Sequence, residues 1–125
     1  MLLFFMTGML MAGPFQEGSL EDIFKKAREQ EKLVLIDVYT TWCGPCKIMD
    51  RQTFKHDAVV EFLKNDVISY KIDAEKGEGP ALAKKYKVAG YPCFLILDSD
   101  GKLVKRKMGF MPPRAFLNWA KDALN

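Results

Sequence analysis

Two hydrophobic periods alternate along the chain and predict a mixture of helices and strands. Apolar and β-branched runs bounded by turn residues predict strands at 33–39, 67–73, 93–98 and 102–110. Apolar residues at helical spacing predict helices over 20–32, 47–54, 58–65, 81–87 and 114–124. The first strand, LVLIDVY, is apolar at almost every position, which is typical of a central strand covered on both faces.

Capping and turn residues separate these elements. Ser19 is placed to cap the first helix, and Glu21 and Asp22 follow in its first turn, as the helix dipole favours. Asp57 is expected to cap a later helix, and the SDG sequence at 99–101 predicts a hairpin turn. The order helix, strand, helices, strand, helix, strand, strand, helix predicts an α/β fold with a mixed central sheet flanked by helices on both faces.

Length and composition indicate one compact domain with a hydrophobic core. The chain has 125 residues, of which 49% are hydrophobic and 28% charged. Three cysteines are too few for a disulfide framework and leave one unpaired. The net charge of +3 comes from scattered lysines, and no run alternates basic and aromatic residues, so nucleic-acid binding has no support. We expect a monomer.

The first thirteen residues, MLLFFMTGMLMAG, differ from the rest of the chain. Their apolar run is too short to span a bilayer as a helix, so no stable membrane span is expected. It fits the apolar core of a secretory signal with Ala12 or Gly13 near the cleavage point, although no basic residue precedes it. A first buried strand and a misplaced start are the alternatives. We therefore divide the chain into a candidate signal peptide, 1–13, and a domain, 14–125, which would be periplasmic if the signal is real and cytoplasmic otherwise.

The sequence TWCGPCK carries the candidate chemistry. Cys43 follows a strand and begins a helix, where backbone N–H groups and the helix dipole favour a thiolate that attacks disulfides. Cys46 lies one turn into the helix, where we expect it to be less exposed but close enough to pair with Cys43. Gly44 and Pro45 permit the tight turn, and Trp42 offers an apolar wall to a partner.

Two residues outside this motif also stand out. Asp37 interrupts an otherwise apolar strand six residues before Cys43, where an unpaired carboxylate is costly and should hold its proton more readily or be bridged by water. It is either a structural acid or a proton-exchange partner of Cys46. Pro92 follows Gly90-Tyr91 just before a strand, a position that can hold a cis bond but does not require one.

These residues together resemble the thioredoxin family. DVYTTWCGPCK matches the family's strand and active-site turn, including the acid six positions before the first cysteine. AKKYKVAGYPCFLILDSDGK resembles the segment with the cis-proline and the following hairpin, and Gly109 matches a glycine after the last strand. The resemblance runs from about residue 19 to the C-terminus and is greatest to thioredoxin-like proteins of bacterial envelopes. It implies the thioredoxin fold.

The resemblance also implies a role for each matching residue. Cys43 would be the nucleophile, Cys46 the resolving thiol, and Asp37 an aid to proton transfer. Pro92 would be cis, with the Tyr91 backbone presented to a substrate strand. The residues of the substrate-binding surface would be Trp42, Gly44, Pro45, Tyr91 and Pro92. The protein would exchange thiols and disulfides with protein substrates, would need no bound cofactor, and would be recycled by a redox partner. The CGPC sequence favours the reducing side of the family.

Three positions depart from the family pattern. Cys93 stands where thioredoxins usually have threonine after the cis-proline, and it is either a small buried hydrophobe or an accessory thiol. Ser69 replaces the family's usual lysine near the buried acid, with Lys71 two positions further on. Tyr39 stands where a tryptophan is common. These differences bear on reduction potential and partner choice.

Two other functions are compatible with some of these residues. A zinc site could use four candidate ligands, Cys43, Cys46, Cys93 and His56, but their spacing beyond the first pair fits no finger pattern, so no metal is expected. An iron–sulfur cluster shared between two chains is a lesser alternative. A docking module that kept the fold without turnover is the non-enzymatic hypothesis. The intact WCGPCK motif favours the enzyme.

Overall fold

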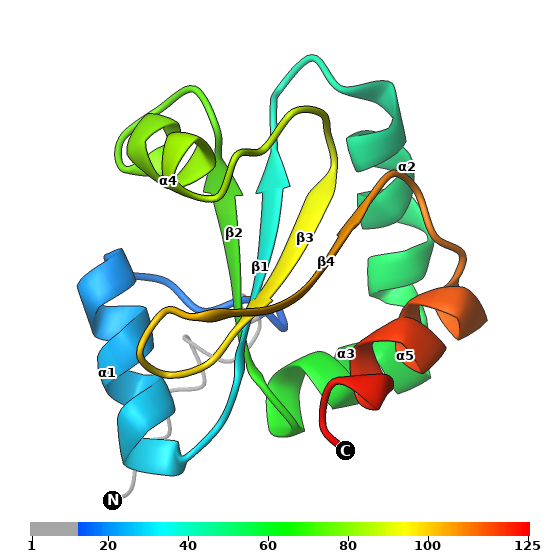
Figure 1. Ribbon diagram of the computed structural model, residues 1–125. Helices are drawn as coiled ribbons and strands as arrows, with labels where there is room; N and C mark the ends of the chain where they lie inside the picture. Colours follow the sequence, from blue (N-terminus) through cyan, green and yellow to red (C-terminus); the bar gives the residue numbers. More distant parts are fainter. Residues whose placement is uncertain (1–12) are drawn as a thin grey trace, which may run out of the picture.

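A computed structural model describes residues 13–125 and contains one mixed sheet of four strands (Figure 1). Their order is β2-β1-β3-β4. β1 (Val34–Tyr39) is parallel to β2 (Ile68–Asp73) and antiparallel to β3 (Cys93–Leu97), and β4 (Leu103–Met108) pairs antiparallel with β3 at the edge. The predicted central strand therefore does lie inside the sheet, with a partner on each side.

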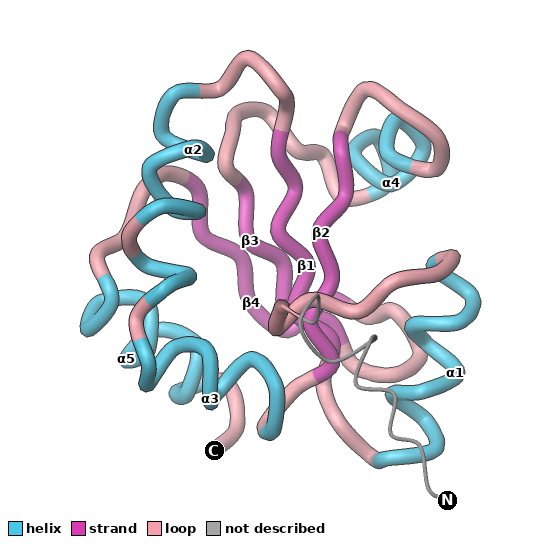
Figure 2. The backbone as a smooth tube through the Cα atoms, turned by 180° about the vertical axis from the view of Figure 1, so that it is seen from behind, coloured by secondary structure: helices cyan, strands magenta, loops and turns pink. Residues whose placement is uncertain are grey.

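Helices cover both faces of this sheet, as the sequence predicts (Figures 1 and 2). α1 (Leu20–Gln30) and α4 (Gly79–Lys85) lie on one face. The other face carries α2 (Gly44–Arg51), the 3-10 helix η1 (Thr53–Lys55), α3 (Asp57–Asn65) and α5 (Pro113–Asp122). The mixed sheet between two helical layers is the predicted thioredoxin fold.

Alternating side chains of β1 and β3 supply both hydrophobic cores. Val34, Ile36 and Val38 face α1 and α4, whereas Leu35 faces the helices of the other layer. In that second layer Phe94 of β3 packs on Phe116 of α5, with ring centroids 5.7 Å apart, and both rings are fully buried. Burying a side chain of this size contributes roughly 1.5–3 kcal/mol. Two buried faces explain why β1 lacks the alternating polar positions of a half-exposed strand.

The cap of α1 agrees with the prediction from sequence, whereas the cap of α3 differs from it. Ser19 caps α1: its hydroxyl accepts a hydrogen bond from the Asp22 N–H at 3.1 Å, and its own N–H donates to the Asp22 carboxylate at 3.0 Å. The prediction that Asp57 caps α3 is wrong. The cap is His56, whose Nδ1 accepts from the Ala58 N–H at 3.2 Å, because the chain is already extended at His56 and Asp57 is helical.

The helix predicted over 47–54 is also divided. α2 ends at Arg51, and Thr53 begins the separate 3-10 turn. The buried Thr53 hydroxyl donates to the Met111 carbonyl at 2.6 Å, which ties this turn to the segment before α5. A contact across 58 residues of sequence cannot be inferred from local periodicity.

The chain reaches α1 along the free side of β2. The Gln16 N–H donates to the Ser69 carbonyl at 2.7 Å, so the segment before the helix is attached to the sheet. The interpretation of 1–13 as a candidate signal concerns residues that, apart from Gly13, lie outside the described part of the chain. Between residues 13 and 125 there is no helix with the length and apolar character needed to cross a bilayer.

Candidate active site

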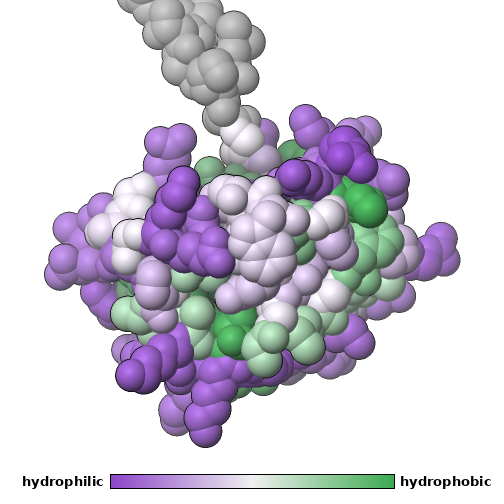
Figure 3. Space-filling model, turned by 90° about the horizontal axis from the view of Figure 1, so that it is seen from above, coloured by the Kyte–Doolittle hydropathy of each residue, from purple (hydrophilic) through white to green (hydrophobic). Residues whose placement is uncertain are grey.

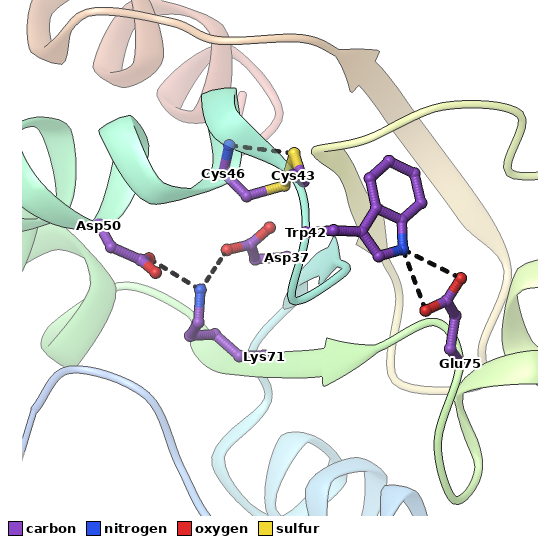
Figure 4. The surroundings of a disulfide bond; sticks show 7 residues. All are labelled: Asp37, Trp42, Cys43, Cys46, Asp50, Lys71 and Glu75. Atoms are coloured by element: carbon purple, nitrogen blue, oxygen red, sulfur yellow. Dashed lines mark hydrogen bonds and ion pairs between the residues drawn. A yellow bond between two sulfur atoms is a disulfide. The ribbon is translucent and has the colours of Figure 1, made fainter.

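Cys43 and Cys46 form a disulfide at the start of α2, directly after the turn that follows β1 (Figure 4). Their Cα atoms are 5.3 Å apart. Cys43 is the N-cap of the helix, and its sulfur accepts a hydrogen bond from the Cys46 N–H at 3.1 Å. The same N–H and the positive end of the helix favour a thiolate on Cys43 when the disulfide is open. The predicted position of Cys43 at a helix start is confirmed.

The two cysteines are equally buried, which the sequence did not predict. Cys43 is 4% exposed and Cys46 is 3% exposed, so exposure does not distinguish them in the disulfide form. Gly44 and Pro45, which lie between them, are exposed at the surface. In this form the two cysteines differ in their place at the helix end and in their distance from the groups beneath the turn.

An open hollow of about 340 Å³ lies beside the disulfide. Trp42 and Tyr91 form its aromatic sides, with ring centroids 5.9 Å apart in an edge-to-face arrangement, and Trp42 is 64% exposed. Figure 3 shows this end of the molecule, where pale and hydrophobic residues gather at the centre and hydrophilic side chains surround them. The hollow is lined by Trp42, Cys43, Gly44, Pro45, Ala89, Gly90 and Tyr91.

The loop on the far side of the hollow has the geometry that the family resemblance implied. The Tyr91–Pro92 bond is cis, and the Pro92 carbonyl accepts from the Gly109 N–H at 2.8 Å. Gly109 directly follows β4 with φ of 101°, a conformation that favours glycine. At Gly90 a β-carbon would come within 2.6 Å of the Met108 sulfur, so the backbone beside the disulfide carries no side chain.

Asp37 lies beneath the turn but is not unpaired, which corrects the sequence-based expectation. Its carboxylate accepts a hydrogen bond from the Lys71 ammonium at 2.7 Å, and its side chain is 1% exposed. Asp37 and Lys71 are direct partners in the parallel register of β1 and β2. Ser69 makes a different contact, since its hydroxyl donates to the Leu63 carbonyl at 2.7 Å. Lys71 therefore provides the cation beside the buried acid.

The charge state of this pair follows from its surroundings. Burial raises the pKa of the Asp37 carboxyl, and the neighbouring Lys71 ammonium offsets this only in part. Burial lowers the pKa of Lys71, but the Asp37 and Asp50 carboxylates outweigh it, so that this pKa stands above its usual value. Asp37 Oδ1 is buried and has no hydrogen-bond partner within residues 13–125. Figure 4 shows Asp37 between the disulfide and Lys71, so the site places a buried carboxyl group next to the cysteine pair.

The remaining candidates lie away from this arrangement. Cys93 is 1% exposed and packs with the core beneath α1 and α4, on the sheet face opposite the one that carries α2. Burial raises the pKa of its thiol, which favours the inert, protonated form. The His56 ring is engaged as a helix cap. Over the described residues, no three side chains from His, Cys, Asp or Glu are grouped in a way that could hold a metal ion.

Two residues of the site were missed by sequence analysis. Asp50 of α2 accepts a hydrogen bond from Lys71 at 2.9 Å, and Glu75 accepts from the Trp42 indole N–H at 3.1 and 3.2 Å (Figure 4). Asp50 follows Cys46 by four residues, the spacing of side chains on one helix face, and that signal could have identified it. Glu75 lies in a polar loop that carries no comparable signal.

The sequence and the fold identify the family. The thioredoxin-like domain family matches residues 20–124, and the chain belongs to it. Thioredoxin Y2 of Arabidopsis thaliana chloroplasts is 38% identical over 107 residues, which cover 86% of this chain and 59% of that protein. The thiol:disulfide interchange protein DsbD of Yersinia pestis (strain Pestoides F) is 36% identical over 94 residues, which cover 73% of this chain and 16% of DsbD. The chain thus spans only part of either relative.

Solved structures show the same likeness. A Bacteroides thetaiotaomicron protein, provisionally named a disulphide-isomerase, is 37% identical with a TM-score of 0.79, covering 89% of this chain and 92% of that one. The reduced C-terminal domain of Neisseria meningitidis DsbD is 28% identical with a TM-score of 0.66, covering 83% and 93%. With the Cys43–Cys46 pair at the start of α2, the domain combines the fold of this family with the cysteine pair of a thiol–disulfide oxidoreductase. None of these comparisons supports a docking or metal-binding module.

Proposed function

We propose that this protein reduces disulfides in protein substrates, with Cys43 as nucleophile, Cys46 as resolving thiol and Asp37 as proton acceptor. The observation that carries the proposal is the Cys43–Cys46 pair at a helix N-terminus directly above a buried, Lys71-paired carboxyl group. A structural crosslink would require neither the exposed hollow beside the disulfide nor a partly unsatisfied acid beneath it.

The proposed cycle begins with both cysteines reduced. The Cys43 thiolate attacks one sulfur of a substrate disulfide, and the other substrate sulfur leaves as a thiolate. Cys46 then gives its proton to the Asp37 carboxylate, and the resulting thiolate attacks the Cys43 sulfur of the mixed disulfide. The Cys43–Cys46 disulfide forms and the second substrate thiolate leaves. Two electrons have passed from the cysteine pair to the substrate, and a thiol donor of the redox partner must restore them.

The hollow suggests how a substrate is held during these steps. Trp42 and Tyr91 offer aromatic walls, and Gly44, Pro45 and Gly90 present little or no side chain beside the disulfide. An extended substrate segment can therefore bring its backbone close to Tyr91 and Pro92 and its cysteine to Cys43. The Trp42 indole N–H donates to the Glu75 carboxylate. This contact fixes the ring and so limits the conformational entropy that Trp42 loses when a substrate binds.

Turnover tests the proposal. The reduced protein should accelerate the reduction of insulin by dithiothreitol, followed by the precipitation of the freed B chain, because a thiolate at a helix start reacts faster than a free thiol near neutral pH. The matched control is Cys43→Ser/Cys46→Ser, which keeps the fold and removes the chemistry. A rate equal to that of the control would contradict an oxidoreductase and favour a docking module.

We further propose that the protein acts in a bacterial envelope. The similarity to DsbD, a thiol:disulfide interchange protein, and the apolar sequence of residues 1–13 support this location. The similarity to chloroplast thioredoxins shows that the domain type also occurs elsewhere, so location needs its own measurement.

Expression of the full chain in a bacterium provides that measurement. We expect export and the loss of roughly the first dozen residues, because the apolar run resembles the core of a secretory signal. Mass spectrometry of the purified protein and fractionation of the cells would show both. Protein that keeps Met1 and stays in the cytoplasmic fraction would contradict the envelope proposal. That result would not contradict the redox chemistry proposed for Cys43 and Cys46.

A further inference from the structure

The segment that leads into the domain contacts the redox site through Phe15. Its backbone is attached to β2 by the bond from the Gln16 N–H to the Ser69 carbonyl, and Lys26 of α1 donates to the Gln16 side chain at 2.9 Å. The Phe15 ring meets the ring of Phe54 edge-to-face, with centroids 5.1 Å apart. Phe15 is thus held against the helical layer that contains α2, although it belongs to no helix or strand.

Phe15 also covers the ammonium group of Lys71. Lys71 Nζ lies 5.3 Å from the Phe15 ring centroid, 4.7 Å from that of Tyr39 and 5.5 Å from that of Phe54. Three ring faces and two carboxylates, those of Asp37 and Asp50, therefore surround one cation. Rings at this distance attract a cation and exclude water, which strengthens the ion pairs it makes.

The outer side of this cation borders solvent. Phe15, Phe54, Asp50 and Lys71 are among the residues that line an open surface hollow of about 410 Å³. Lys71 keeps 25% of its side chain exposed, whereas Asp37 behind it is 1% exposed. Phe15 consequently lies on the solvent side of the Lys71–Asp37 ion pair, in a hollow that neither cysteine lines.

We propose that Phe15 is a positioning residue for the redox reaction: its ring keeps Lys71 on Asp37, and this contact sets the proton affinity of the carboxyl group that receives the Cys46 proton. The inference rests on the role proposed above for Asp37. It makes the entry segment of the chain, outside the regular elements, a working part of the site.

The contacts of Phe15 determine whether removing its ring raises or lowers the pKa of Asp37. The Phe15 ring lies over the Lys71 ammonium and beside Phe54, whereas Asp37 behind them is 1% exposed, so we expect removal of the ring to expose Lys71 rather than Asp37. Water then reaches Lys71 and weakens its attraction for the Asp37 carboxylate, so the pKa of Asp37 rises further. The substitution removes none of the other titratable groups around the pair, which are Asp50, Cys43, Cys46, Cys93, Tyr39, and Lys55 and Lys64 at the hollow.

The experiment is a pH titration of the Asp37 carboxyl carbon by NMR in the reduced, full-length protein. Phe15→Ala should move the midpoint upward by about 0.5–1 pH unit, a fraction of the shift that one close opposite charge produces. The acid limb of the resolving rate should move in the same direction. Phe15→Trp should keep the wild-type midpoint, because it keeps a ring over the ammonium. If Phe15→Ala fails to fold, Phe15→Leu replaces it and should shift the midpoint upward by less.

Two further variants make the test specific. Phe24→Ala removes a ring that is partly buried, like that of Phe15, but packs on the opposite face of the sheet. This variant should leave the titration midpoint of Asp37 unchanged. Asp50→Asn should lower the midpoint, because it removes a negative charge and a competitor for Lys71. An unchanged midpoint in Phe15→Ala, or an equal shift in Phe24→Ala, would overturn the inference. If Asp37→Asn left the resolving rate unchanged, the role of Asp37 would fail, while the titration would still show whether Phe15 sets its proton affinity.

Discussion

Cys46→Ser is expected to accumulate mixed disulfides with substrates, whereas Cys43→Ser should capture none. Cys43 alone has its sulfur at the N-cap of α2, where the Cys46 N–H supports a thiolate, so it performs the attack. Cys46 is needed only to release the substrate. Each variant would be incubated with an oxidised protein substrate and run on a non-reducing gel. Cys46→Ser should show a band of the trapped mixed disulfide, and Cys43→Ser should show none.

The trapping experiment should be repeated in a Cys93→Ser background. Cys93 is buried in the opposite core with the pKa of its thiol raised, so we expect the same bands with and without it. Trapping by Cys43→Ser that disappears in this background would instead make Cys93 an accessory redox thiol. Equal loss of trapping in both single variants, with metal bound to the wild type, would contradict the redox function altogether.

Asp37→Asn is expected to slow the resolving step by roughly 10²- to 10⁴-fold near neutral pH, the usual contribution of a general base. An amide cannot take the proton of Cys46, whereas the initial attack by Cys43 needs no such transfer. Single-turnover kinetics would separate the two steps, since the mixed disulfide forms at nearly the wild-type rate and then persists. Asp57→Asn, an exposed acid in the first turn of α3, is the matched control.

The same substitution should stabilise the reduced protein, and the effect should depend on pH. Because the pKa of Asp37 is raised in the folded state, the folded carboxyl holds its proton longer than the unfolded one. The wild type therefore loses stability as pH rises from the unfolded value of about 4 through the folded pKa, and the neutral amide does not. Thermal unfolding should give a higher Tm for Asp37→Asn at pH 7 and nearly equal values near pH 3. A lower Tm at pH 7 with normal turnover would make Asp37 a structural acid only.

Local sequence patterns were sufficient for most of the fold and for the chemistry of the cysteine pair. The apolar run of β1 predicted a strand covered on both faces, and Ser19 predicted the start of α1. The WCGPCK motif carries its own geometry, because a helix that begins at Cys43 places Cys46 one turn away whatever the rest of the chain does. The His56 cap of α3 and the break after Arg51 were missed, since each depends on contacts at the boundary between elements.

The electrostatic part of the site was decided only by tertiary structure. Asp37 and Lys71 are 34 residues apart, and they meet because β1 and β2 pair in parallel with these two positions opposite one another. Alignment of motifs alone assigned the family's lysine position to Ser69, which instead bonds to Leu63. Phe15 lies against the same cation because the backbone N–H of the next residue, Gln16, bonds to Ser69 at the edge of the sheet. Strand register and the course of a terminal segment arise from the packing of the whole chain, whereas a helix start or a buried strand is written in consecutive residues.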